Sequence, residues 1–95
     1  MEIEKSHIVR SIAGRDKGRS FVVLETDGEY LILADGRLRR VESPKRKKRK
    51  HTELISVQIS PLTQRILQGE KVLNSEIRKT LSLNATASED TSIGR

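Results

Sequence analysis

Short apolar segments separated by tight turns constrain the fold of this chain more than any other feature. Turn signals stand at residues 14–19, at Asp27-Gly28 and at Asp35-Gly36, because glycine tolerates positive φ and Asp-Gly is typical of two-residue hairpins. The segments around them are rich in Ile, Val and Leu, which favour strands. We predict strands at residues 8–13, 20–25, 29–34, 37–41 and 51–60. Five short strands joined by tight turns predict a mainly β fold closed as a small barrel, which removes exposed sheet edges.

The basic run at residues 45–50 separates the last two of these strands. It carries only Lys and Arg, and runs of like charge repel themselves and are often flexible. We therefore expect a flexible connector tethered at both ends, with Pro44 marking the end of the fourth strand. The strand after it alternates: Ile55, Val57 and Ile59 share one face, which predicts a half-buried strand up to Ser60.

Helical signals follow residue 60. Ser60 is suited to an N-cap, Pro61 to the first helical position and Gly69 to the end of a helix. A second short helix is predicted from Asn74 or Ser75, with Leu73, Ile77 and Leu81 at helical spacing and packed on the barrel. The chain thus divides into a barrel at 1–60, a helical segment at 61–82 and a tail at 83–95 that we expect to be disordered, because it holds few large apolar residues.

Composition limits the chemistry available to the chain. The 95 residues include no Cys, and His7 and His51 stand far apart with no ligands at metal-binding spacing, so we expect no metal, no cofactor and no enzyme activity on a small-molecule substrate. No signal peptide or membrane-spanning apolar stretch is recognisable, so we expect a cytoplasmic protein without membrane partners. A net charge of +6 indicates a polyanionic partner instead.

The segment "IVRSIAGRDKGRSFVVL", with a basic loop containing glycines between two strands, resembles a KOW motif, which occurs in ribosomal proteins and transcription factors. Its continuation "LILADGRLRRVESPKRKKRKH" is similar to small bacterial KOW-domain RNA-binding proteins that resemble large-subunit ribosomal proteins of archaea and eukaryotes. The resemblance covers residues 7–51 well and extends more loosely to residue 81. It implies an SH3-like five-stranded barrel that binds RNA through the KOW loop and the nearby basic surface.

Three segments supply the candidate RNA contacts: the KOW loop, the predicted fourth strand and the basic run. Loop residues bring cations and close backbone approach to phosphates, and guanidinium groups match phosphate geometry. The predicted RNA-binding residues are Arg15, Lys17, Gly18, Arg19, Arg37, Arg39, Arg40, Lys45, Arg46, Lys47, Lys48, Arg49 and Lys50.

Each segment also has a simpler interpretation. The loop could be only a turn, with its charges solvated. Arg37 and Arg39 are expected on one face of the fourth strand with Leu38 pointing inward, and this strand could be only an edge protected by charge against aggregation. The run 45–50 could be a nuclear localisation signal.

The favoured function is recognition of structured RNA, ribosomal or ribosome-associated, through phosphate contacts. Phe21 and Tyr30 are the only aromatic residues, and single-stranded RNA is usually held by stacking on aromatic side chains. If the basic segments neutralise about six phosphates, log K should fall with log salt at a slope of roughly −4 to −5. The alternative is a module that docks on the ribosome or RNA polymerase through protein contacts.

Overall fold

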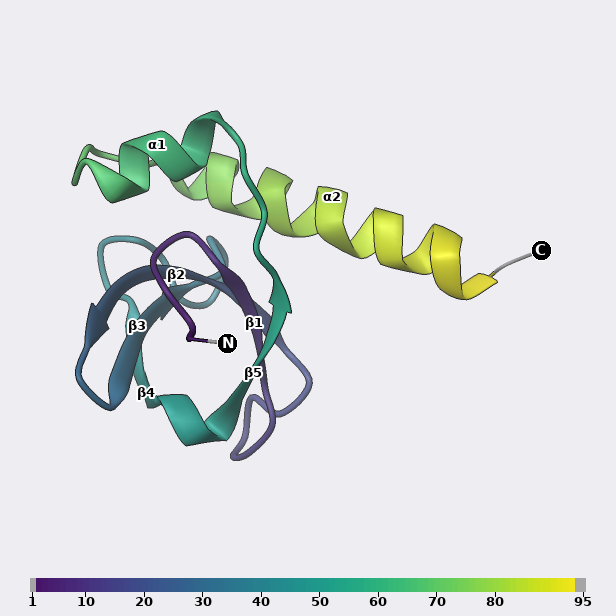
Figure 1. Ribbon diagram of the computed structural model, residues 1–95, viewed down its shortest axis with the longest axis horizontal. Helices are drawn as coiled ribbons and strands as arrows, with labels where there is room; N and C mark the ends of the chain where they lie inside the picture. Colours follow the sequence, from purple (N-terminus) through teal and green to yellow (C-terminus); the bar gives the residue numbers. More distant parts are fainter. Residues whose placement is uncertain (1, 94–95) are drawn as a thin grey trace.

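The computed structural model describes the backbone of residues 2–93 and the side chains of residues 2–84. In this part of the chain, five antiparallel strands form one sheet in the order β4-β3-β2-β1-β5, and two helices follow (Figure 1). The elements are β1 (Ile8–Ser11), β2 (Ser20–Asp27), β3 (Tyr30–Ala34), β4 (Lys45–Lys48), a 3₁₀ turn η1 (Arg49–His51), β5 (Thr52–Ser56), α1 (Pro61–Leu67) and α2 (Asn74–Ile93).

The sheet is strongly curved, because the short turn η1 joins its two edge strands, β4 and β5, directly (Figure 1). This arrangement confirms a mainly β fold and is compatible with a small barrel. Apolar side chains on the inner face form one buried cluster: Val9, Phe21, Val23, Leu31 and Leu33.

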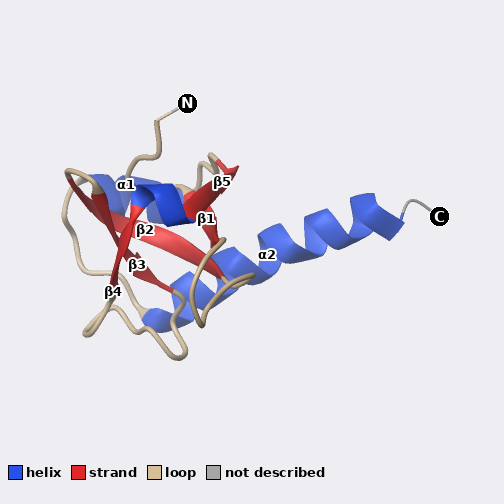
Figure 2. Cartoon of the chain, turned by 90° about the horizontal axis from the view of Figure 1, so that it is seen from below, coloured by secondary structure: helices blue, strands red, loops and turns tan. Residues whose placement is uncertain are grey.

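A second apolar cluster lies on the outer face of the sheet. Neighbouring residues of a strand point to opposite faces, so Ile8 packs outward although Val9 packs inward. The helices and the segment between them cover this outer face with Leu62, Ile66, Val72 and Ile77. Figure 2 shows α2 crossing one side of the sheet and extending beyond it. Apolar residues on both faces of the strands therefore require the C-terminal helices as a cover.

The fourth strand differs from the prediction. Residues 37–41 form a loop instead of a strand, and Leu38 is 70% exposed rather than inward-facing. The basic run supplies the strand: β4 pairs with β3 from Leu33 opposite Lys45 to Tyr30 opposite Lys48. Pro44 accordingly precedes β4 and does not end a strand before it. The prediction of a flexible connector at 45–50 is wrong, because charge repulsion within the run is offset by carboxylates brought from elsewhere in the chain.

The fifth strand is shorter than predicted. Strand β5 ends at Ser56, and Ile59 is 88% exposed, so the expected buried face ends after Ile55. The chain turns away here to begin α1. The side-chain amide of Gln58 donates to the Ser6 carbonyl (2.9 Å) and holds the connecting segment against the N-terminal part of the chain.

The first helix begins where the sequence predicts. Ser60 precedes it with extended backbone, Pro61 is its first residue, and the Ser60 N–H donates to Thr63 Oγ1 (3.1 Å). Gly69, with φ of +73°, follows its end. These local signals are sufficient here because capping depends on adjacent residues.

The second helix begins at Asn74, as predicted, but its packing and length differ. Ile77 is fully buried and Leu81 partly so, whereas Leu73 is 51% exposed because it precedes the helix, and Val72 packs in the core instead. The backbone is helical to Ile93, beyond the end at residue 82 that the sequence predicts, and the disorder expected from residue 83 stays a prediction. No Gly or Pro interrupts residues 75–93, and helix propagation is favourable once a nucleus exists. Gly94 and Arg95 lie outside the described residues.

Within the described residues, neither helix is both long and apolar enough to cross a membrane.

Substitution of Gly36 tests how closely α2 packs against the loop after β3. Gly36 has φ of +77°, and a Cβ there would overlap the Asn74 carbonyl oxygen and lie 2.9 Å from Arg78 Cγ. We expect Gly36→Ala to lower the free energy of unfolding by about 3 kcal/mol, because left-handed strain of about 1 kcal/mol adds to displacement of α2. Urea denaturation followed by circular dichroism measures this change.

Gly28→Ala is the matched control. Gly28 also has positive φ, +60°, but a Cβ there meets nothing within 4 Å. It should cost only the backbone strain, about 1 kcal/mol. Equal losses in the two variants would show that α2 does not pack on Gly36.

Candidate nucleic-acid interface

The loop between β1 and β2, residues 12–19, is a compact turn held by its own backbone. The Gly18 N–H donates to the Ser11 carbonyl (2.8 Å) and the Arg19 N–H to the Asp16 carbonyl (2.9 Å). Gly14 and Gly18 both have positive φ. With its backbone closed on itself, this basic loop presents Arg15 and Lys17 to solvent.

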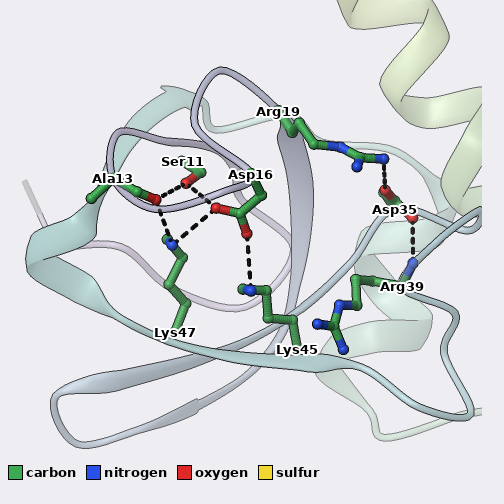
Figure 3. Close-up of polar contacts among 8 residues, drawn as sticks. All are labelled: Ser11, Ala13, Asp16, Arg19, Asp35, Arg39, Lys45 and Lys47. Atoms are coloured by element: carbon green, nitrogen blue, oxygen red, sulfur yellow. Dashed lines mark hydrogen bonds and ion pairs between the residues drawn. The ribbon is translucent and has the colours of Figure 1, made fainter.

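Asp16 joins the basic loop to β4. Its Oδ1 lies 2.6 Å from Ser11 Oγ and 3.1 Å from Lys47 Nζ, and its Oδ2 lies 3.2 Å from Lys45 Nζ. Lys47 is buried and also donates to the Ala13 carbonyl at 2.9 Å. Figure 3 shows both ammonium groups directed at the loop from β4. The basic run and the basic loop are therefore adjacent.

The same contacts determine the ionisation of Asp16. Burial by itself would raise the pKa of this carboxyl, but the hydrogen bond from Ser11 and the ammonium groups of Lys47 and Lys45 outweigh burial and hold the pKa well below its usual range. Asp16 is therefore ionised at neutral pH, and Lys47 has a buried counter-ion.

Asp35 holds the backbone of residues 35–41, which we call the arginine loop. Its Oδ1 accepts the backbone N–H groups of Arg37 (2.8 Å) and Arg39 (2.9 Å). This turn explains why the segment is not a strand, because a carboxylate that accepts nearby N–H groups competes with sheet pairing. The Asp35 Oδ2 lies 3.3 Å from Arg19 Nη2 (Figure 3), so one carboxylate links the two loops.

Helix α2 is joined to the arginine loop by two hydrogen bonds. The Asn74 side-chain oxygen accepts the Val41 N–H at 2.9 Å, and Arg78 Nη1 donates to the Gly36 carbonyl at 2.7 Å. Arg65 of α1 pairs with Glu76 of α2 and joins the two helices. The arginine side chains of the loop thus extend from a backbone fixed on both sides.

The predicted contact residues divide into free and engaged cations. In the described part of the chain, seven are exposed and have no ion pair or side-chain hydrogen bond: Arg15, Lys17, Arg37, Arg39, Arg40, Lys48 and Lys50. The first five belong to the two loops that Asp35 links. Gly18 is exposed in the basic loop, and Arg19 is 42% exposed at its side chain while paired with Asp35. Lys45 and Lys47 are held by Asp16.

The other arginines of the basic run lie outside this arrangement. The Arg46 guanidinium stacks 3.9 Å from the centre of the Tyr30 ring and pairs with Asp27 at 3.1 Å. Arg49 donates to the Gly28 and Ile3 carbonyls, each at 2.7 Å. Both side chains hold the β2–β3 turn or the N-terminal segment, so the structure does not gather them with the loop cations.

Sequence reasoning identified the cations and missed the acids that organise them. It treated Asp16 and Asp35 as turn residues, yet each makes contacts outside its own turn. The available signal was the position of each acid as a single carboxylate within a basic segment. Such a carboxylate can serve as the counter-ion that a buried or half-buried lysine needs. The sequence does not indicate which lysine pairs with Asp16, because Asp16 and Lys47 are 31 residues apart.

Comparison of the sequence with models of protein families gives no match, and comparison with curated proteins gives none either. The KOW resemblance therefore remains a prediction. Among the residues that the structure describes, no three His, Asp or Glu side chains gather where they could hold a metal ion.

Removing the Asp16 charge tests its role in the interface. We expect Asp16→Asn to lower the free energy of unfolding at pH 7 by about 3 kcal/mol, because the buried Lys47 ammonium loses its counter-ion. The lowered pKa of Asp16 stabilises the fold above about pH 4, the value of an unfolded aspartate, and this contribution is lost as the pH falls below that value. The difference between wild type and variant should therefore shrink in acid, as measured by urea denaturation from pH 7 to pH 3.

Asp27→Asn provides the control with the same chemical change. Asp27 pairs with Arg46 at the surface, where both side chains are more than half exposed, so the change should stay within about 1 kcal/mol. Equal effects of the two substitutions, or a difference independent of pH, would contradict the role of Asp16.

Proposed function

We propose that this chain is a KOW-type RNA-binding module with an SH3-like barrel, and that it binds structured RNA through phosphate contacts. One observation carries the proposal: two loops, linked through Asp35, present five exposed cations that have no ion pair or side-chain hydrogen bond with any described residue, Arg15, Lys17, Arg37, Arg39 and Arg40. The basic loop is closed by its own backbone hydrogen bonds, and the arginine loop is held by Asp35 and by α2, so little ordering of the backbone is needed when RNA binds.

Two further features support the family assignment. The segment "IVRSIAGRDKGRSFVVL" resembles a KOW motif, and it forms β1, the basic loop and the first part of β2. The strand order β4-β3-β2-β1-β5, with a 3₁₀ turn between β4 and β5, is compatible with an SH3-like barrel. On the same resemblance we propose ribosomal or ribosome-associated RNA as the target, met in the cytoplasm.

The aromatic side chains support a structured target. Phe21 is buried in the inner core, and Arg46 covers one face of the Tyr30 ring. These are the only aromatic residues in the sequence, so no platform of several rings is available for stacking successive bases. Recognition of shape and phosphates, as in double-stranded or folded RNA, needs no such ring.

The salt dependence of binding should be weaker than the cation count suggests. Lys47 and Arg49 are committed to internal contacts, and the exposed Lys48 and Lys50 lie in β4 and η1, outside the two linked loops. We therefore take the five loop cations as the principal phosphate contacts. About five neutralised phosphates give a slope of log K against log salt of roughly −4. Fluorescence anisotropy with an RNA hairpin between 50 and 300 mM KCl would measure that slope.

Replacing two loop cations tests the location of the interface. We expect Arg15→Ala with Lys17→Ala to reduce the magnitude of the slope by about 2 and to weaken binding at 0.1 M salt by a factor of about 10 or more, because two phosphate contacts are lost. Both side chains are exposed, so stability should be unchanged.

Lys71→Ala with Lys79→Ala removes the same charge from exposed positions outside the two loops and the basic run. It should change the slope by less than about 0.5, because only long-range attraction is reduced. Equal losses in both double variants would mean that net charge alone drives binding. Binding insensitive to salt would contradict the proposal as a whole.

A further inference from the structure

A groove between the outer face of the sheet and α2 is lined by residues of β1, β5 and α2 and of the two loops. Figure 2 shows that α2 extends past the sheet. The volume of the groove is about 590 Å³, and its apolar lining comes from Ile8, Ile55 and Leu81. Four arginines also line it: Arg10, Arg19, Arg37 and Arg78. Pockets of roughly 300–1,000 Å³ suit a ligand of small-molecule size, so the groove fits one nucleotide unit and is too small for a duplex.

The charge of the groove favours an anion. Among the described residues that line it, Asp35 is the one acid, and that carboxylate already holds Arg19 and the backbone of the arginine loop. Arg10 pairs with Glu53 at a half-exposed position, and Arg78 donates to the Gly36 carbonyl. Arg37 has no side-chain partner among the described residues. An occupant must therefore supply negative charge beside an apolar portion.

The groove is continuous with the proposed RNA interface. Arg19 belongs to the basic loop and Arg37 to the arginine loop, and both also line the groove. An RNA backbone that contacts these two side chains passes the mouth of the groove. A nucleotide that leaves the helical stack at this point can enter it without a change in the loops.

We propose that the groove receives one unpaired nucleotide of the bound RNA. The base lies on the aliphatic floor of Ile8, Ile55 and Leu81, its phosphate meets Arg19 and Arg37, and Ser20, Ser82 and Asn84 offer hydrogen bonds to the base edge. Guanidinium planes can also stack on bases. The inference rests on the proposed function and adds a discriminating element: structured RNA with a bulged nucleotide is preferred over a continuous duplex.

Two RNA hairpins with the same stem, one carrying a single unpaired nucleotide, test this preference by fluorescence anisotropy. Wild-type protein should bind the bulged hairpin at least about fivefold more tightly, because the apolar surface of the base is removed from water on the aliphatic floor. Ser82→Glu places a negative charge in the groove from an exposed position of α2. It should remove the preference and leave binding of the paired hairpin within about twofold, because the loop phosphate contacts remain.

Leu83→Glu is the matched control. Leu83 is the next residue of α2, is 61% exposed and does not line the groove, so the same charge change should preserve the preference. Far-ultraviolet circular dichroism verifies that both variants keep their helices.

The outcomes separate this inference from the proposed function. Equal, salt-dependent binding of both hairpins by wild type overturns the groove assignment and leaves phosphate recognition intact, whereas failure to bind either hairpin overturns the proposed function. Equal effects of the two glutamate substitutions also overturn the groove assignment. A labelled glutamate-rich peptide forms the last arm: if Ser82→Glu abolishes its binding and leaves the RNA preference unchanged, the groove takes a protein segment instead.

Discussion

The ion pair between Asp16 and Lys47 is the contact on which the rest of the interface depends. Repulsion among six successive basic residues opposes their pairing as an edge strand. Asp16 binds the ammonium groups of Lys45 and Lys47, the two residues of the run that point toward the basic loop. One carboxylate therefore both permits β4 to form and fixes the loop that presents Arg15 and Lys17.

Asp35 does the same for the arginine loop by a different geometry. It accepts backbone N–H groups rather than neutralising the arginines, so Arg37 and Arg39 keep their charges free while their backbone is fixed. Its remaining oxygen binds Arg19 across the gap between the loops. Two buried or partly buried acids thus separate the basic side chains of this surface into two groups. Some pair with these acids and hold the fold, and the others face outward.

The sequence predicts the parts of this fold that depend on neighbouring residues. Alternating and apolar segments located β1, β2 and β3, and the Ser60-Pro61 pair located α1. Neighbouring residues could not predict that 45–48 form a strand and 37–41 a loop. Charge repulsion within 45–50 favours a loop there, and Asp16, which offsets that repulsion, is 31 residues from Lys47 along the chain. Leu38 between two arginines has the alternating pattern of a strand, but the Asp35 carboxylate holds this segment as a turn and leaves Leu38 exposed.

The helical segment is least covered by the family resemblance and contributes most to the shape of the surface. Outward-facing Ile8 and Val22 need a cover, which α1 and α2 provide. Figure 2 shows that α2 crosses the sheet and continues past it. Among the described residues, apolar side chains of β1, β5 and α2 line a groove next to the arginines. If the chain binds RNA as proposed, the two loops offer cations to any phosphate backbone, and we expect discrimination between RNAs to come from the surface that α2 adds to them.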